Sequence, residues 1–142
     1  MRKRRYSLFS QDFYVEMTRN EIPKMLKRIC DEAENHVLIV SPSFEPEIYL
    51  DEEVFSTLQE RVQQGVTVKC VIGRDANKET IEKYKRIAEL KQLEINPRYH
   101  VIVVDNRNAL RIKEDEGIVF PEDRGACYEY SLYFLEFWTA IF

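Results

Sequence analysis

Polar side chains follow two apolar runs of the sequence, at the point where each run ends. Ser41 and Ser43 come directly after the run 36–40, and Arg74 and Asp75 follow the next run along the chain. The carboxyl ends of parallel strands meet at one edge of a sheet, where ligands bind in α/β proteins. If both runs are strands, two hydroxyls, a guanidinium and a carboxylate share that edge. Such a group suits an anionic or hydroxyl-rich small ligand.

A second pair of polar residues, Arg98 and His100, stands at the beginning of a further apolar run, 99–104. If that strand runs antiparallel, its beginning reaches the same edge, and alternation along a strand puts both side chains on one face. Ser-Pro and Gly-Arg-Asp are also ordinary turn sequences, and a histidine beside an arginine is often structural. A binding crevice and plain turn chemistry therefore both stay open.

The apolar pattern predicts the elements that would position these residues. Helices are expected over residues 20–33, 51–64, 81–90 and 126–142, and strands over 36–40, 66–72, 93–96, 99–104, 109–112 and 117–120, with weak strand character at 8–15. Asn20 is the expected N-cap of the first helix, and Gly65 fits a left-handed C-terminal cap after the second. Residues 105–108 have the composition of a tight turn, and 117–120 is a possible edge strand.

The order of these elements predicts an α/β fold with a mixed sheet. Alternating helices and strands give parallel strands joined by right-handed crossovers, and the strands from residue 99 onward add a C-terminal hairpin. The short, wholly apolar run 36–40 is typical of a central strand with helices on both faces of the sheet. We expect a basic N-terminal arm with a possible edge strand over 1–19 and one α/β domain over 20–142. A length of 142 residues fits one domain.

Charge and cysteine content exclude several classes of protein. The formal net charge is -4 at pH 7, so the domain as a whole has no reason to bind a polyanion. The basic run at residues 2–5 is either a nucleic-acid or membrane-surface arm or a solvated tail. Cys30, Cys70 and Cys127 lack CxxC spacing, so we expect small buried side chains and neither a disulfide framework nor a metal site. No cofactor is expected.

The two ends of the sequence bear on location and assembly. No apolar segment follows the basic start, and the aromatic C-terminal segment is short and contains Glu129 and Glu136. We therefore expect a cytoplasmic protein with neither a signal peptide nor a transmembrane segment. The C-terminal segment is apolar over much of its circumference, so we expect it to pack across the sheet and to meet a second subunit in a homodimer.

Residues 93–112 resemble the motif region of the phospholipase D superfamily, in which His-x-Lys-x-x-x-x-Asp begins a strand that precedes a hairpin. Residues 35–43 and 65–74 also resemble one repeat of that fold, so the resemblance covers roughly residues 20–142. The family's nucleophilic histidine falls on Arg98 and its phosphate-holding lysine on His100, while the aspartate is kept as Asp105. Its Gly-Ser pair falls on Ile112 and Lys113 and is missing.

These departures argue against the family's hydrolysis. A guanidinium stays protonated near neutral pH and cannot be a covalent nucleophile for phosphate. If His100 attacked instead, the attacking atom would move by several ångströms, and ~1 Å can cost about 100-fold in rate. We therefore expect no catalytic residue. The expected ligand-binding residues are Ser41, Ser43, Arg74, Asp75, Arg98, His100 and Asp105.

The chain also resembles the effector-binding half of archaeal sugar-responsive transcription regulators of the TrmB type. That resemblance implies a ligand-sensing, dimerising domain that is part of, or partner to, a transcription regulator, with a small anionic or sugar-like ligand and a DNA-binding partner or domain. Two alternatives stay open. One is a single-motif phosphodiesterase or nuclease that acts as a dimer. The other is a protein or membrane interaction module that uses the basic run and the aromatic C-terminal helix.

Overall fold

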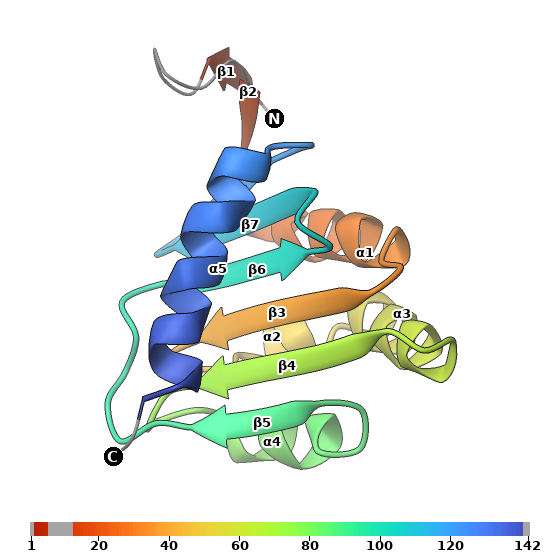
Figure 1. Cartoon of the computed structure of the whole chain (residues 1–142), viewed down its shortest axis with the longest axis vertical. Helices are drawn as coiled ribbons and strands as arrows, with labels where there is room; N and C mark the ends of the chain where they lie inside the picture. The colour runs from red at the N-terminus through yellow and green to blue at the C-terminus, as the bar shows by residue number, and fades with distance from the viewer. Residues whose placement is uncertain (1, 6–12, 141–142) are drawn as a thin grey trace.

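The computed structural model describes residues 2–5 and 13–140, whose strands form one eight-stranded sheet in the order β1-β2-β8-β7-β6-β3-β4-β5 (Figure 1). The strands are β1 (Arg2–Arg5), β2 (Phe13–Thr18), β3 (His36–Ser41), β4 (Thr67–Ile72), β5 (Glu89–Gln92), β6 (His100–Val104), β7 (Asn108–Lys113) and β8 (Glu116–Phe120). The helices are α1 (Ile22–Asp31), α2 (Pro46–Tyr49), α3 (Glu52–Gln63), α4 (Lys78–Tyr84) and α5 (Arg124–Trp138), and a 3₁₀ turn η1 (Arg19–Glu21) precedes α1.

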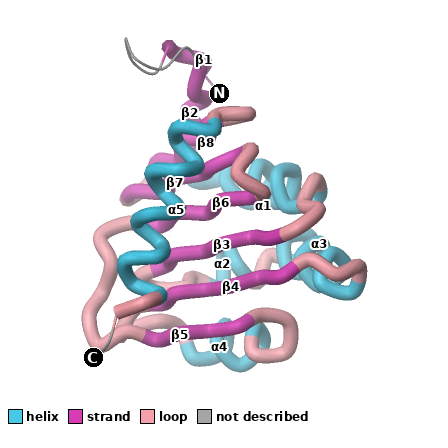
Figure 2. The backbone as a smooth tube through the Cα atoms, viewed as in Figure 1, coloured by secondary structure: helices cyan, strands magenta, loops and turns pink. Residues whose placement is uncertain are grey.

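The sheet is mixed, as the sequence predicts. β3 pairs in parallel with β4, and β4 with β5. β6 joins β3 antiparallel, and the sheet continues through β7, β8, β2 and β1 in antiparallel pairs. In Figure 2 α5 crosses the near face of the sheet, while α1–α4 lie on the other side. The predicted fold class, an α/β mixed sheet with a hairpin and helices on both faces, is confirmed.

Each face of the sheet has its own apolar core. Ile39 of β3 packs beneath α1–α4, whereas its neighbour Val40 packs beneath α5 with Val101 of β6 and Phe134. Because strand side chains alternate between faces, a strand covered on both sides must be apolar at every position, which explains the continuous apolar runs. Cys30, Cys70 and Cys127 are buried in these cores as the sequence predicts, and burial raises the pKa of the Cys30 thiol to about 12.

Local signals fix the ends of several helices. Asp51, Asn77 and Asp123 each accept a hydrogen bond from a backbone N–H in the first turn of the helix that follows. Gly65 ends α3 with a φ of 101°, as predicted. The predicted N-cap Asn20 is wrong: η1 comes first, and the Glu21 carboxylate accepts from the Thr18 backbone N–H and hydroxyl in a capping box.

The predicted positions of the third helix (81–90) and of the third parallel strand (93–96) are wrong by about four residues. α4 ends at Tyr84, and the third parallel strand is Glu89–Gln92 rather than residues 93–96. Ile87 and Ala88 continue the apolar spacing of α4 but pack against the same core from a turn, which imitates a longer helix. β5 is an edge strand whose side chains are partly exposed, so it lacks the apolar run that marks β3 and β4.

The structure also differs from the sequence predictions at β8, at the first strand and at the last helix. β8 is not an edge strand, because β2 pairs with its outer side. The predicted weak strand at 8–15 corresponds to β2 at 13–18, and residues 8–12 lie outside the described part. The last helix spans residues 124–138 rather than 126–142. Residues 141–142 of the predicted helix lie outside the described part of the chain. Within the described chain, no helix has the length and apolar character that a membrane span requires.

The end of α5 is fastened to the edge of the sheet. The Lys91 ammonium group on β5 donates hydrogen bonds to the carbonyl oxygens of Trp138 (2.7 Å) and Ala140 (2.6 Å). Lys69 on β4 lies 5.5 Å above the Trp138 ring, within cation–π range. A cation at a helix C-terminus satisfies free carbonyls and complements the helix dipole. These contacts position α5 across the strands that it covers.

Asp105 fastens the turn between β6 and β7 to the start of β3. Asp105 and Asn106 have φ values of 54° and 56°, and the Arg107 N–H donates to the Val104 carbonyl, which together give a hairpin turn that favours Asp and Asn. The Asp105 carboxylate accepts the backbone N–H groups of residues 34, 35 and 36 at 2.6, 2.9 and 2.8 Å. Partial burial works to raise the pKa of this carboxyl, but the three hydrogen bonds hold it below its ordinary value.

We predict that Asp105→Ala lowers the free energy of unfolding by about 2–3 kcal/mol, because it leaves three backbone donors without their acceptor. Asp105→Asn is the matched variant, since it keeps the preference for positive φ and one acceptor oxygen, and it should cost less. Urea denaturation at pH 7 measures both. An unchanged urea midpoint for Asp105→Ala would show that the three hydrogen bonds to the Asp105 carboxylate contribute nothing to stability.

Candidate functional site

Three loops meet at the carboxyl edge of the parallel strands. The loop after β4 donates from the Gly73 N–H to the Ser41 carbonyl (3.0 Å) and from the Asn77 N–H to the Ser43 carbonyl (2.8 Å). The Arg74 N–H donates to the Ile95 carbonyl (3.1 Å), which adds the loop before β6. The edge predicted from the sequence is therefore one hydrogen-bonded surface.

Gly73 makes the close approach of these loops possible. A Cβ atom at this position would lie 2.3 Å from the carbonyl oxygen of Pro42, closer than real carbon–oxygen contacts. Only glycine lets the two loops pack at this distance.

His100 lies at the start of β6, opposite the end of β3, and both of its ring nitrogens have partners. Nδ1 lies 2.9 Å from Ser41 Oγ and 2.9 Å from the Tyr49 hydroxyl, and Nε2 lies 3.4 Å from Glu45 Oε1. The Phe44 N–H already donates to Ser41 Oγ (2.8 Å), so the serine proton is free to point into the cluster. The Nε2–H tautomer satisfies this arrangement, with Nδ1 accepting a hydroxyl proton.

The imidazole is neutral in this environment. Its side chain is 9% exposed, and burial, with a further contribution from the charge of Arg19, lowers the pKa of His100 to about 4. Glu45 accepts from Ser43 Oγ (3.1 Å) and forms an ion pair with Arg19. The carboxylate that faces Nε2 is therefore already paired with a guanidinium, and does not hold a proton on the ring at neutral pH.

Aromatic side chains pack against the buried side of the cluster formed by His100, Ser41 and Glu45. The rings of Tyr49 and His100 stack at 5.8 Å, and burial raises the pKa of the Tyr49 phenol. Tyr84 donates to the Tyr49 carbonyl (2.7 Å) and packs against Phe44, whose ring is fully buried. Phe44 has a φ of 51°, a left-handed conformation that is rare for a bulky residue. Burial and the hydrogen bond to Ser41 hold it there.

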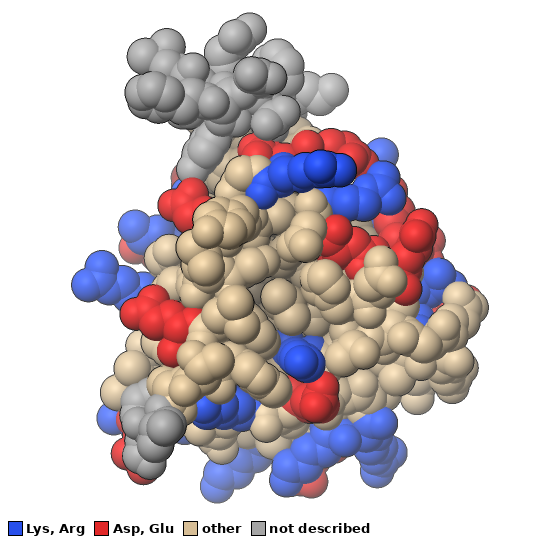
Figure 3. All heavy atoms as spheres, in the orientation of Figure 1, with Lys and Arg blue, Asp and Glu red and all other residues tan. Residues whose placement is uncertain are grey.

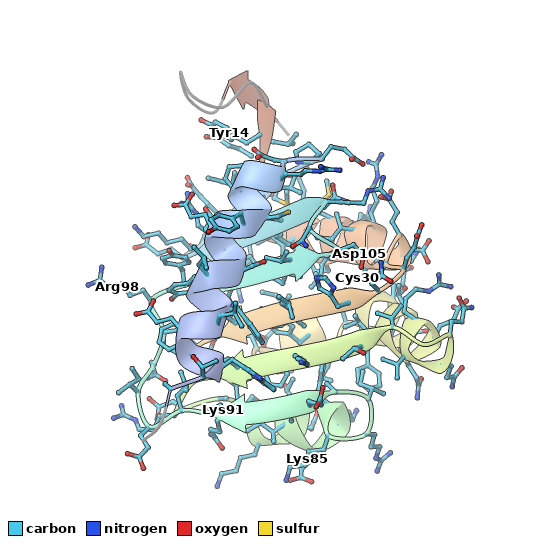
Figure 4. All side chains as sticks on the ribbon, in the orientation of Figure 1. Tyr14, Cys30, Lys85, Lys91, Arg98 and Asp105 are labelled. Carbon is cyan, nitrogen blue, oxygen red and sulfur yellow. The ribbon has the colours of Figure 1, made fainter. Side chains whose placement is uncertain are left out.

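The outer rim of the edge is polar and exposed. Arg74 donates to Asp75 through Nε and a terminal nitrogen, both at 3.3 Å, and Asn96 Nδ2 donates to Asp75 Oδ2 (2.9 Å). The hydrogen bond from Arg74 is the main cause that lowers the pKa of the Asp75 carboxyl. Arg98 precedes β6 instead of alternating with His100 along it, and its side chain points away from the body of the protein (Figure 4).

The structure thus brings together part of the predicted set. Ser41 contacts His100 directly, Ser43 reaches the same cluster through Glu45, and the Arg74–Asp75 pair lies on the adjoining loop. Arg98 does not face the cluster. Asp105 lies at the opposite edge of the sheet, at the other end of β6 (Figure 4).

Sequence reasoning missed Arg19, Glu45 and Tyr49, which complete the cluster. One signal was available: Thr18 and Glu21 have capping-box spacing, which places Arg19 in the first turn after β2. Nothing in the sequence links Glu45 or Tyr49 to His100, because the contact between Tyr49 and His100 joins residues 51 positions apart.

The architecture matches that of known phospholipase D proteins. No family model matches the sequence, and no curated protein is similar to it. Among solved structures, the phospholipase D family member Nuc from Salmonella typhimurium superimposes with a TM-score of 0.70 at 15% identity, over 88% of this chain and 93% of that one. NucT from Helicobacter pylori gives 0.69 at 12% identity, over 88% and 94%.

The archaeal chromatin protein TrmBL2, whose structure shows a novel mode of DNA binding, superimposes with a TM-score of 0.64 at 17% identity. The match covers 88% of this chain but only 51% of TrmBL2. Together these neighbours show that the chain has a phospholipase-D-like fold, as its sequence predicts. At these identities the likeness concerns the fold alone.

We predict a pH-dependent stability that originates in His100. Between pH 6.5 and about 4 the unfolded histidine binds a proton that the folded one does not, so stability falls as the pH falls through this window and is constant above it. The full effect is about 3 kcal/mol. His100→Asn, which keeps an acceptor for the hydroxyls, should be less stable at pH 7 but should lose this slope.

Urea denaturation at several pH values measures the slope. Asp105→Asn is the control, since it keeps the histidine and should therefore keep the wild-type slope above pH 5. An unchanged slope in His100→Asn would assign the pH dependence to another group.

Proposed function

We propose that this chain is a non-catalytic, ligand-sensing and dimerising phospholipase-D-like domain, working in the cytoplasm with a DNA-binding partner or domain of a transcription regulator. The observation that carries the proposal is the state of His100. It stands where the family's motif has its phosphate-holding lysine, yet it is buried and neutral, and hydroxyls and a paired carboxylate contact its two ring nitrogens.

This arrangement supports binding rather than catalysis. A nucleophile needs a free lone pair within reach of the substrate. The Nδ1 lone pair of His100 is directed at Ser41 and Tyr49 inside the protein, and Nε2 faces Glu45. Attack on a phosphorus atom would first require this network to break.

The ion pair of Arg19 and Glu45 offers a route by which a ligand could be sensed. The Arg19 side chain is 35% exposed and that of Glu45 is 25% exposed, so a solute can reach both. An anionic group that takes over the guanidinium would release the carboxylate that faces His100 Nε2. Since the other nitrogen contacts β3 and α2, ligand binding would be transmitted from the surface into the sheet.

The structural neighbours agree with a regulatory role without deciding it. TrmBL2 binds DNA, and this chain superimposes on about half of it, which supports a DNA-binding partner or further domain. Nuc and NucT superimpose with higher TM-scores than TrmBL2, so the phosphodiesterase alternative is tested below by an activity assay.

We predict a saturable rise in melting temperature with one of four probes: inorganic phosphate, an inositol phosphate, a nucleotide or maltose. At about 100 times the Kd the stabilisation is about 2.7 kcal/mol, or roughly 5–10 °C. Arg19→Gln should weaken the response at least tenfold. Arg107→Gln, which removes a guanidinium from the ion pair with Glu122 at the opposite edge, is the matched control and should respond as wild type.

If no probe of this panel shifts the melting temperature, the sensing proposal fails and the interaction-module alternative gains support. A response that Arg19→Gln leaves unchanged would place the ligand at another site.

We further predict no metal-independent hydrolysis of bis-p-nitrophenyl phosphate above the buffer rate, because the imidazole is not available for attack. Steady-state assays at pH 5–8 compare wild type with His100→Ala. Turnover that disappears in His100→Ala would instead establish the single-motif phosphodiesterase.

A further inference from the structure

The outer face of α5 carries most of the large apolar side chains that the described protein exposes. The exposed large apolar residues of the described chain are Ile95, Tyr128, Leu132 and Leu135, and the last three lie on α5 with 68%, 49% and 44% exposure. Figure 3 shows a largely uncharged surface over this helix. A contiguous exposed apolar patch of this kind marks an interaction site.

The spacing of these residues is that of a helix-pairing seam. Gly125, Tyr128, Leu132, Leu135 and Thr139 follow one another at alternating intervals of three and four residues and are all exposed. Alternating intervals of this kind define the a and d positions of a coiled coil, in which each side chain inserts between side chains of a second helix. The outer face of α5 therefore fits a helix.

A groove beside the seam provides room for the side chains of that helix. It has a volume of about 650 Å³ and is lined by Asp105, Asn106, Arg107, Arg124, Tyr128, Ser131, Leu132 and Leu135. The groove runs between α5 and the turn that joins β6 to β7, so a docked helix would contact both. Ser131 Oγ is buried there, and within the described residues it has no hydrogen-bond partner.

The charges that flank the seam favour one orientation of two identical helices. Arg124 lies on one flank, and Glu129 and Glu136 lie on the other; within the described chain none of the three forms an ion pair. In a parallel pair, Arg124 faces the partner subunit's Glu129, and symmetry repeats the contact. In an antiparallel pair, Glu129 faces the partner subunit's Glu136, which is repulsive.

We infer that the outer face of α5 is the dimer interface of this protein, and that the α5 helices of two copies pack parallel about a two-fold axis along their seam. The inference rests on the dimerising role proposed above and identifies its surface. A two-fold interface uses the same patch on both subunits, which a self-complementary pattern of one arginine and one glutamate satisfies. One helix pair buries less than the about 800 Å² per partner of a standard interface, so the dimer should dissociate in the micromolar range.

The first experiment measures mass by sedimentation equilibrium over about 5–500 µM, the range in which such an interface dissociates. Wild type should be dimeric at the upper end, and Leu132→Glu/Leu135→Glu should be monomeric throughout. Both side chains are exposed, so the variant should keep the wild-type circular dichroism. Ile95→Glu, which changes a similarly exposed apolar residue in the loop between β5 and β6, is the control and should dimerise. A monomeric wild type, or a dimeric double variant, overturns the inference.

Charge reversal tests the orientation. Arg124→Glu and Glu129→Arg should each raise the dimer Kd about tenfold or more, and the double variant should recover most of the loss, because the contact is restored with its sign exchanged. Two single variants that each weaken the dimer without mutual rescue would contradict the parallel pairing.

Disulfide trapping gives an independent readout of orientation. Tyr128→Cys and Leu135→Cys should each form an intersubunit disulfide on oxidation, because a parallel pair places every seam residue opposite itself. The native cysteines are buried, so background trapping is low. Trapping at neither position, as an antiparallel pair predicts, or at one position only would overturn the inference.

The ligand response separates this inference from the proposed function. The thermal-shift panel repeated on Leu132→Glu/Leu135→Glu reports ligand binding in the absence of the interface. A retained ligand response with a monomeric wild type overturns the α5 interface alone. An intact dimer without any ligand response leaves the interface standing and overturns sensing.

Discussion

The antiparallel pairing of β6 with β3 is the constraint on which the other features depend. It brings the start of β6 to the carboxyl end of β3, and so places His100 against Ser41. At the other end of the same pair, Asp105 binds the backbone N–H groups before β3. The two strands are thus fastened at both ends by polar contacts. Everything between these contacts is apolar, so the register cannot slip without burying a polar group unpaired.

The same pairing decides which groups the His100 imidazole contacts. In a chain with an open edge, an imidazole at the start of β6 would be exposed to substrate. In this protein α2 lays Tyr49 across the ring, and η1 brings Arg19 to the carboxylate that faces it. The His100 side chain therefore connects three elements, β6, β3 and α2, through its hydrogen bonds. The part of this junction that solvent reaches is the ion pair of Arg19 and Glu45.

The central part of the fold could be predicted from sequence because its physical signal is local. β3 and β6 have continuous apolar runs in their interiors and β4 is mostly apolar, and Gly65 and Asp105-Asn106 stand where turn geometry demands them. β5 could not be placed, since an edge strand needs no apolar run, and Ile87 and Ala88 continue the helical spacing beyond the end of α4.

The site was harder to predict than the fold for a different reason. Ser41 and His100 come together across 59 positions of sequence, and Glu45 approaches His100 only because a short helix turns the chain back after β3. Contacts of this kind depend on side-chain packing, which no local pattern encodes. Arg98 shows the converse, since it precedes β6, which begins at His100, and its side chain is exposed to solvent.

The outermost strand β5 has a consequence for how copies of the chain can associate. β5 forms one margin of the sheet and carries the charged residues Glu89 and Lys91. Charged edge strands resist the addition of further strands from other molecules, which is how sheets escape growth into fibrils. Growth of the sheet is thereby discouraged at the β5 margin. In the proposed dimer, two copies would meet through the outer face of α5 instead, and such a two-fold assembly would be closed and finite.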